Sequence, residues 1–178
     1  MSVFAKSMSN GYPMGAVVGS REAMAPSEKA FISSSYWSDN VGLAASLTTI
    51  RELRRRDSTA RFKQIGEDLR VALEHAIESV GVPVRVTGLH TRPTLQFDVP
   101  DGTLRGKVET LFVQEMALRG IHCYTGFMAT LAHTQEDIRI TADAAAESFK
   151  VVMAGLEGDV DGLLKTRPSQ APFRRLVR

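Results

Sequence analysis

The sequence predicts an α/β fold whose second half is a small α+β unit. Short apolar runs at residues 3–5 and 16–18 are typical of strands. Apolar residues recur at helical spacing over 43–80 and over 138–156, whereas those between 84 and 99 alternate as they do in strands. The second half therefore predicts the order strand, strand, helix, strand, helix, with both helices on one face of the sheet.

Composition places the chain among soluble globular proteins. Of its 178 residues, 43% are hydrophobic and 24% are charged, and 22 Lys and Arg against 20 Asp and Glu give a formal net charge of +2. These values argue against a disordered chain, and the length suits one domain, or one domain plus a piece of another. The near-neutral charge gives no support for a nucleic-acid or membrane partner.

The expected location is the cytoplasm. The chain has one cysteine, Cys123, so an internal disulfide cannot form, which fits a reducing compartment. Residues 1–6 lack the apolar core of a signal peptide. No window holds the roughly 20 apolar residues that a membrane helix needs.

The segment before residue 40 predicts two strands, each followed by a loop. The pairs Asn10-Gly11 and Tyr12-Pro13 are turn signals between the strands, so Lys6 lies in the first loop. The second loop, residues 30–39, holds four serines, a tyrosine and the only tryptophan. This density of hydroxyls and aromatic rings is higher than a spacer needs.

Two helices are expected next. One face of the first helix carries apolar residues three or four positions apart, at Leu43, Leu47, Ile50 and Leu53. Asp57-Ser58 breaks the pattern and supplies an N-cap for the second helix. That helix continues to Gly81, which is a C-terminal stop, and it is expected to connect two units.

The first part of the small unit is expected to hold two strands and a helix. Apolar residues alternate over 84–86 and 95–99, as in strands. Asp101-Gly102 predicts a turn, and the apolar spacing over 108–116 predicts a helix that ends at Gly120.

A short strand and a long helix complete the expected unit. The strand covers residues 121–124. Thr134 and Asp137 have the spacing of a capping box, which opens the amphipathic helix over 138–156. The remaining residues, 159–178, are expected to form a mobile tail.

No metal site is expected. The histidines have no ligand-like spacing, at His75, His90, His122 and His133. His122 stands directly beside Cys123, which suits a strand better than a zinc site. We interpret His133-Thr134 as the entry of a helix. The arginines at 54–56 indicate a solvated face rather than a nucleic-acid patch.

Three segments together resemble one enzyme family. Residues 4–19 read Phe-Ala-Lys-Ser-Met-Ser-Asn-Gly-Tyr-Pro-Met-Gly-Ala-Val-Val-Gly, residues 31–39 read Phe-Ile-Ser-Ser-Ser-Tyr-Trp-Ser-Asp, and residues 132–138 read Ala-His-Thr-Gln-Glu-Asp-Ile. They resemble the class III aminotransferases, and most closely the glutamate semialdehyde aminomutase-like branch. The resemblance runs from about Val3 to Gly155. It matches the part of a family member between the cofactor lysine and the C-terminus, and the first half of such an enzyme has no counterpart in the chain.

This resemblance implies the type I fold of enzymes that depend on pyridoxal phosphate (PLP), together with roles for particular residues. Lys6 lies at the position of the lysine that forms the Schiff base with the cofactor. Ser35, with a one-residue ambiguity toward Ser34, lies at the position of a hydroxyl residue, usually threonine. In the family this hydroxyl reaches across a homodimer to the phosphate of the partner's cofactor.

The chemistry of PLP asks for these residue types. A primary amine must attack the aldehyde and later be displaced by a substrate amine, which a lysine can do. The freed amine then serves as a general base, while the cofactor is the electron sink. Hydroxyls and backbone N–H groups of a serine-rich loop suit the phosphate.

The resemblance also implies a domain organisation. Residues 1–57 would be the incomplete end of a large PLP-binding domain, 58–82 a connecting helix, 83–158 a small C-terminal α+β domain and 159–178 the tail. The implied reaction transfers an amino group between an amine or amino acid and a carbonyl compound, or shifts it within one molecule as a mutase does. The family's partner for the pyridinium nitrogen lies upstream of the lysine, so this chain is expected to be inactive alone. The alternative is a non-catalytic interaction module, or a relic fragment, that docks on a full-length paralogue.

Overall fold

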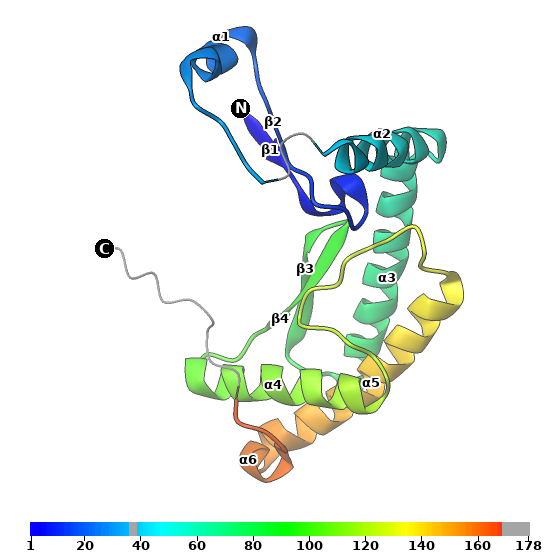
Figure 1. Cartoon of the computed structure of the whole chain (residues 1–178). Coiled ribbons are helices and arrows are strands. Elements are labelled where there is room, and N and C mark those ends of the chain that lie inside the picture. The colour runs from blue at the N-terminus through cyan, green and yellow to red at the C-terminus, as the bar shows by residue number, and fades with distance from the viewer. Residues whose placement is uncertain (36–38, 169–178) are drawn as a thin grey trace. The chain divides into compact units, whose positions relative to one another are not determined.

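The computed structural model describes residues 1–35 and 39–168. The chain divides into two compact units, Met1–Thr59 and Ala60–Arg178 (Figure 1). The tyrosine, tryptophan and serine at positions 36–38, which belong to the predicted second loop, lie outside the described residues.

A two-stranded antiparallel sheet forms the start of the first unit. Strand β1 (Ser2–Phe4) pairs with β2 (Ala16–Val18), and Val3 lies opposite Val17. Both strands predicted in this segment are therefore confirmed. The 3-10 helix η1 (Lys6–Ser9) follows β1 directly and carries Lys6 at its first position.

Helices complete the first unit. Two short ones follow β2, namely α1 (Arg21–Met24) and η2 (Ala25–Lys29). The longer α2 (Asn40–Arg55) begins at Asp39, whose Oδ1 accepts a hydrogen bond at 2.9 Å from the backbone N–H two residues on. The predicted break after this helix is confirmed, because Asp57 has a φ of 45°, in the left-handed region that interrupts a helix.

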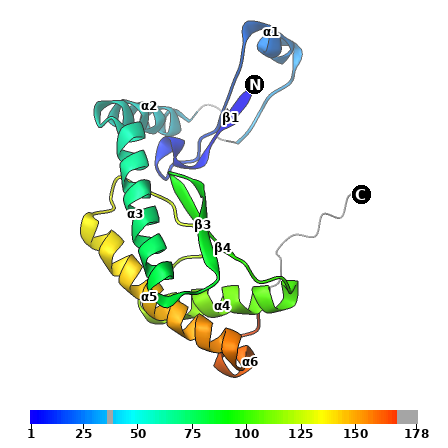
Figure 2. The ribbon, with the colours of Figure 1, turned by 180° about the vertical axis from the view of Figure 1, so that it is seen from behind.

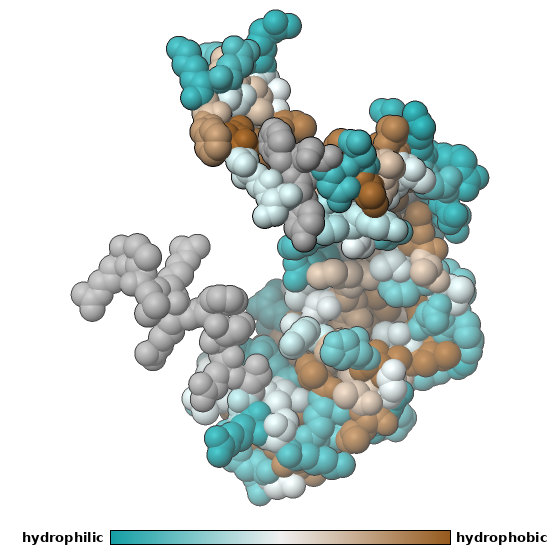
Figure 3. Space-filling view, in the orientation of Figure 1, coloured by the Kyte–Doolittle hydropathy of each residue, from teal (hydrophilic) through white to brown (hydrophobic). Residues whose placement is uncertain are grey.

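Apolar side chains of the first unit are largely exposed. In the part of this unit that the structure describes, no residue belongs to the hydrophobic core, and Phe31 is 97% exposed. The predicted apolar face of α2 is half exposed, at Leu43, Leu47 and Ile50. Its buried residues are instead Gly42 and Ser46. Figure 3 shows apolar surface, in brown, on the visible face of both units.

The second unit packs a β-hairpin with three long helices. Its elements in chain order are α3 (Ser58–Val80), β3 (Val84–Leu89), β4 (Arg92–Phe97), α4 (Gly102–Leu118), α5 (Gln135–Glu157) and the short α6 (Val160–Leu163). The two strands are antiparallel, with Val84 opposite Phe97 and Leu89 opposite Arg92. Figures 1 and 2 both show α3 running along the hairpin.

Two helix starts in this unit have clear caps, and one of them, at Thr134, was predicted. The capping box is confirmed: Thr134 Oγ1 accepts from Asp137 N–H at 3.2 Å, and Asp137 Oδ2 accepts from Thr134 N–H at 2.8 Å. The turn expected at Asp101-Gly102 is the start of α4. Asp101 Oδ1 accepts from the Leu104 N–H at 2.8 Å, so the aspartate is an N-cap.

A segment beside β4 replaces the strand predicted at 121–124. Backbone hydrogen bonds join residues 125–127 to β4: Leu95 N–H donates to Thr125 O at 2.7 Å and Phe127 N–H donates to Pro93 O at 2.9 Å. Ala129 N–H donates to the residue just before β4, Thr91 O, at 3.1 Å. The prediction was therefore about four residues too early. The reason lies at the end of α4, where Ile121 N–H still donates to the helix carbonyl of Met116 at 2.9 Å.

The core of the second unit lies between the helices and one face of the hairpin. Its largest fully buried side chains include Phe112 of α4 and Phe149 of α5, whose rings stack at a centroid distance of 5.0 Å. Phe97 of β4 meets Phe112 edge-on at 5.8 Å. The helix predicted as a connector also contributes here, because Leu69 and Leu73 of α3 are buried in the same core.

The segment predicted as a tail begins with ordered contacts. Helix α6 packs on α4 through the buried Val160 and an ion pair of 2.6 Å between Lys107 Nζ and Asp161 Oδ2. The Gln114 side chain makes two hydrogen bonds to the end of α6 and the residues after it. Its NH2 group donates to Leu163 O at 3.1 Å, and its carbonyl oxygen accepts from Lys165 N–H at 2.6 Å. No helix in the described residues is long and apolar enough to cross a bilayer.

Gly66 sets the distance between α3 and the tip of the hairpin. A Cβ at this position would lie 1.6 Å from the carbonyl oxygen of His90, so the hairpin backbone rests directly on the helix. A hydrogen bond reinforces the contact: His90 Nδ1 lies 3.1 Å from Glu67 Oε2. Hydrogen bonds from Arg70 and His90 hold the pKa of Glu67 at about 2.

We expect Gly66→Ala to lower the free energy of unfolding by about 1–3 kcal/mol, because the hairpin must move to admit the methyl group. Gly106→Ala in α4 is the matched control. A Cβ there meets nothing within 4 Å, so this variant should gain about 0.5–1 kcal/mol from the better helix former. Urea unfolding followed by circular dichroism measures both. A Gly66→Ala midpoint equal to or above that of Gly106→Ala would contradict the contact.

Candidate cofactor site

Lys6 lies in a tight turn with unusual backbone geometry. Its φ is 55°, a left-handed conformation that residues other than glycine seldom adopt, and Asn10 at the other end of the turn has a φ of 48°. Strained backbone of this kind is found preferentially at functional sites. The turn is closed by hydrogen bonds from Met8 N–H to Ala5 O and from Asn10 N–H to Ser7 O, both 3.2 Å.

The Lys6 side chain is exposed and has no partner. Among the described residues, it makes no hydrogen bond and no ion pair. The buried residue of the turn is Ser9, whose hydroxyl donates to the Tyr12 carbonyl. The turn therefore fixes the backbone at Lys6, while its amine makes no polar contact with the described residues.

Helix α2 supports this turn from the side. Both views of the fold place η1 against α2 (Figures 1 and 2). A Cβ at Gly42 would lie 2.8 Å from the carbonyl oxygen of Pro13 and 3.5 Å from the Cβ of Met14, so the helix backbone touches the loop after the turn. Sequence reasoning missed Gly42 and Ser46; two small residues four apart on one helix are the signal that could have found them.

Ser34 and Ser35 lie in an exposed loop between η2 and α2. Within the described part of the chain, neither hydroxyl has a hydrogen-bond partner, and no hydrogen bond joins either serine to Lys6. The structure thus leaves all three predicted side chains available in the first unit. It does not bring the lysine and the serines together through a direct contact.

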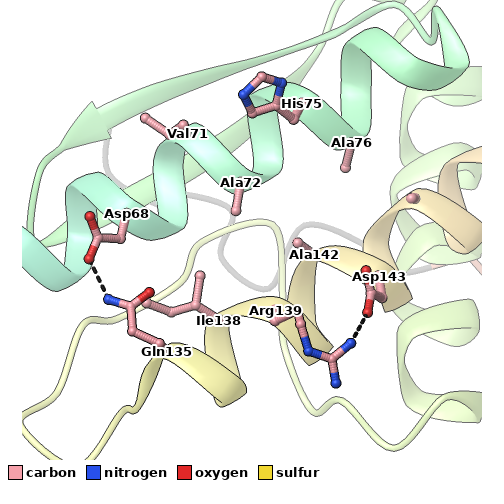
Figure 4. Close-up of a pocket in the computed structure, with 11 residues that line it drawn as sticks. Asp68, Val71, Ala72, His75, Ala76, Gln135, Ile138, Arg139, Ala142 and Asp143 are labelled. Carbon is pink, nitrogen blue, oxygen red and sulfur yellow. Dashed lines mark hydrogen bonds and ion pairs between the residues drawn. The ribbon is translucent and has the colours of Figure 1, made fainter.

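The second unit holds an open groove between α3 and α5, with a volume of about 700 Å³ (Figure 4). Its polar side chains are engaged with each other: Gln135 donates to Asp68 at 2.7 Å and Arg139 donates to Asp143 at 2.6 Å. Alanines line much of the remaining surface, at Ala72, Ala76, Ala142 and Ala146. His75 also lines the groove, and its Nδ1 lies 3.9 Å from Oε2 of Glu78, which is outside the lining.

A second hollow, of about 490 Å³, lies beside the segment 120–128. Burial raises the pKa of the Cys123 thiol at its edge to about 11, so this thiol is neutral near pH 7 and a poor nucleophile. His133 is part of the helix entry, where its Nδ1 accepts from Thr130 N–H at 3.2 Å. In the described residues, no group of three His, Cys, Asp or Glu side chains could hold a metal ion.

Comparison with known proteins finds relatives of this chain among the aminotransferases. No family model matches it. A 3-aminobutyryl-CoA aminotransferase from Cloacimonas acidaminovorans is 30% identical over 85% of this chain and 37% of its own length. An aminopentol aminotransferase from Sphingopyxis macrogoltabida is 28% identical over 86% of this chain and 36% of its own length. The chain matches the C-terminal portion of a class III aminotransferase.

Further relatives are consistent with this match. A glutamate-1-semialdehyde 2,1-aminomutase from Brevibacillus brevis is 23% identical over 84% of this chain. A solved PLP form of the FumI protein from Sphingopyxis sp. MTA144 aligns with a TM-score of 0.79 and 24% identity, over 91% of this chain and 39% of that one. The predicted fold, part of the type I PLP transferase fold, is thereby confirmed. The aminotransferase-like chain spans somewhat more than a third of the length of these curated relatives.

The donor groups on the first unit suit PLP. The amine of Lys6 can bond to an aldehyde, and the hydroxyls of Ser34 and Ser35, which have no partner among the described residues, can donate to a phosphate. The carboxylates nearby are less suited to the pyridinium nitrogen. Asp39 already caps α2, and Glu52 is held by Arg55 and Arg56, which lower its pKa to about 2.

Proposed function

We propose that this chain supplies the cofactor lysine, Lys6, to a PLP-dependent enzyme that moves an amino group. The substrates would be an amine or amino acid and a carbonyl compound, in an aminotransferase or an aminomutase reaction. The enzyme would act as a cytoplasmic homodimer, with Ser35, or Ser34 beside it, on the phosphate of the partner's cofactor. The match to named aminotransferases and aminomutases supports this class of reaction.

One observation carries the proposal: Lys6 is held by a strained turn, yet its amine has no partner in the described residues. A lysine with no role beyond the surface needs no strained backbone. A lysine that must bond to one atom of a cofactor benefits from a fixed backbone, because holding the two groups in position removes much of the entropic cost of the reaction.

Within such an enzyme, each side chain has a defined task. Bound PLP supplies an electron sink for the substrate carbon. The amine of Lys6 would hold the cofactor through its aldehyde group. In the complete enzyme the same amine would act as the general base that moves a proton at the substrate carbon. The serine hydroxyl donates to a phosphate oxygen and thereby orients the cofactor.

The chain alone should bind PLP without turning over a substrate, because no described carboxylate is assigned to the pyridinium nitrogen. Cofactor attachment, which Lys6 and the serine loop would provide, can therefore be measured apart from the full reaction. Binding of PLP is therefore the quantity to measure.

Equilibrium dialysis with PLP tests these roles. Lys6→Ala should reduce binding to the level of scattered surface lysines, while Lys29→Ala, in the exposed η2, should leave it unchanged. Ser35→Ala should weaken binding about ten- to 150-fold, because a hydrogen bond to a charged group is worth about 1.5–3 kcal/mol. Ser34→Ala resolves the ambiguity between the two serines, and Ser33→Ala is the matched loop control. Equal binding by Lys6→Ala and the unchanged chain would refute the proposal.

A further inference from the structure

Ser46 has an unusual environment for a helix hydroxyl. It is 6% exposed, and its oxygen is buried with no hydrogen-bond partner in the described residues. Native structures satisfy most buried polar atoms, and leaving one unpaired costs about 1–3 kcal/mol. An unpaired hydroxyl at such a place calls for a functional explanation.

Two other helix hydroxyls in this chain avoid the cost of an unpaired oxygen by bonding to their own helix. Thr48 in the same helix donates to the Ala44 carbonyl at 2.9 Å, and the buried Ser148 donates to the Ala144 carbonyl at 2.7 Å. Both bonds reach the carbonyl four residues earlier, which a serine in a helix can do locally. Ser46 does not use this bond, so its hydroxyl is available to a group outside the helix.

The position of Ser46 indicates where that group lies. Ser46 is four residues after Gly42, so both lie on one face of α2, and these are the buried residues of that helix. Gly42 approaches the Pro13 carbonyl, in the loop that continues from the Lys6 turn. Helix α2 also packs on η1 itself. The unpaired hydroxyl therefore lies on the face that supports Lys6.

We propose that Ser46 is a positioning residue for Lys6. Its hydroxyl completes a hydrogen bond with the segment 6–14 when Lys6 is bonded to PLP, and this bond holds the turn in its cofactor-bound geometry. The inference rests on the proposed function. It adds a residue that contacts neither cofactor nor substrate and acts through the backbone of the turn.

Two measurements on the full chain test this role: thermal unfolding without PLP, and the PLP concentration that half-saturates borohydride-trapped labelling of Lys6. Ser46→Ala should unfold at the same or a higher temperature, because it removes an unpaired buried hydroxyl. It should nevertheless need about tenfold more PLP, the effect of losing one hydrogen bond. Thr48→Ala should leave the PLP requirement unchanged, and Ser46→Thr, which keeps the hydroxyl, should restore most of the labelling.

The outcomes are distinguishable. Equal PLP requirements for Ser46→Ala and the unchanged chain would overturn the role of Ser46 while leaving that of Lys6 intact. A lower unfolding temperature for Ser46→Ala without PLP would also overturn it, since the hydroxyl would then have a partner in the free chain. If the unchanged chain shows no preferential labelling at Lys6, the proposed function fails first, and the role of Ser46 fails with it.

Discussion

Replacing Phe112 with alanine is expected to lower the free energy of unfolding of the second unit by about 3–5 kcal/mol. The Phe112 side chain is fully buried, stacks on Phe149 and meets Phe97 edge-on, so it joins α4, α5 and β4 in one contact. Removing it leaves a cavity in a close-packed core, and the surrounding side chains fill such a cavity only in part. Small domains are stable by only about 5–15 kcal/mol, so a large part of the stability should be lost.

Leu118→Ala is the matched control for this prediction. Leu118 lies in the same helix but is 57% exposed, so its removal should change the free energy of unfolding by about 0.5 kcal/mol or less. Urea denaturation followed by circular dichroism gives both values. Similar midpoints for the two variants would show that the three rings do not form the core described here.

The second large effect concerns association. The first unit exposes a two-stranded sheet and one apolar face of α2, with Val3 75% exposed and Leu43 50% exposed. A two-stranded sheet is marginally stable by itself, and exposed apolar surface is typical of interaction sites. The purified chain is therefore expected to form dimers or larger assemblies at micromolar concentration.

Sedimentation velocity over a range of concentrations measures this association. The double variant Leu43→Ser with Leu47→Ser should shift the equilibrium toward monomer about tenfold or more, because each leucine buried at an interface contributes up to about 1.5–3 kcal/mol. Leu89→Ser, on a 73% exposed leucine of β3, is the control and should have a smaller effect. A monodisperse, cooperatively melting monomer would contradict the prediction.

Local sequence signals predicted much of the second unit. The capping box at Thr134 and the helical stripes of α3 and α5 depend on residues within one or two turns of each other, and the structure confirms them. The contact between Gly66 and the His90 carbonyl joins residues 24 apart in sequence. No local sequence pattern indicates such a contact, so the position of the hairpin against α3 could not be predicted.

The candidate site, too, could be predicted from the sequence only in part. The motif around Lys6 predicted a loop with a candidate lysine, and the structure places Lys6 in a turn of that loop. The left-handed backbone at Lys6 could not be foreseen, because residues other than glycine rarely adopt it. The apolar periodicity of α2 predicted a helix but not its buried side, since periodicity shows which face is apolar and not what covers it.

Reduction of the PLP-treated chain with borohydride, followed by peptide mass spectrometry, tests the central claim most directly. Hydride adds to the bond between lysine nitrogen and cofactor carbon and makes the attachment permanent, so each labelled lysine can be identified. We predict near-stoichiometric labelling at Lys6 and little at Lys29 or Lys63, both of which lie outside the strained turn. Labelling scattered equally over the lysines would contradict the account, and would favour a non-catalytic interaction module that retains an aminotransferase fold.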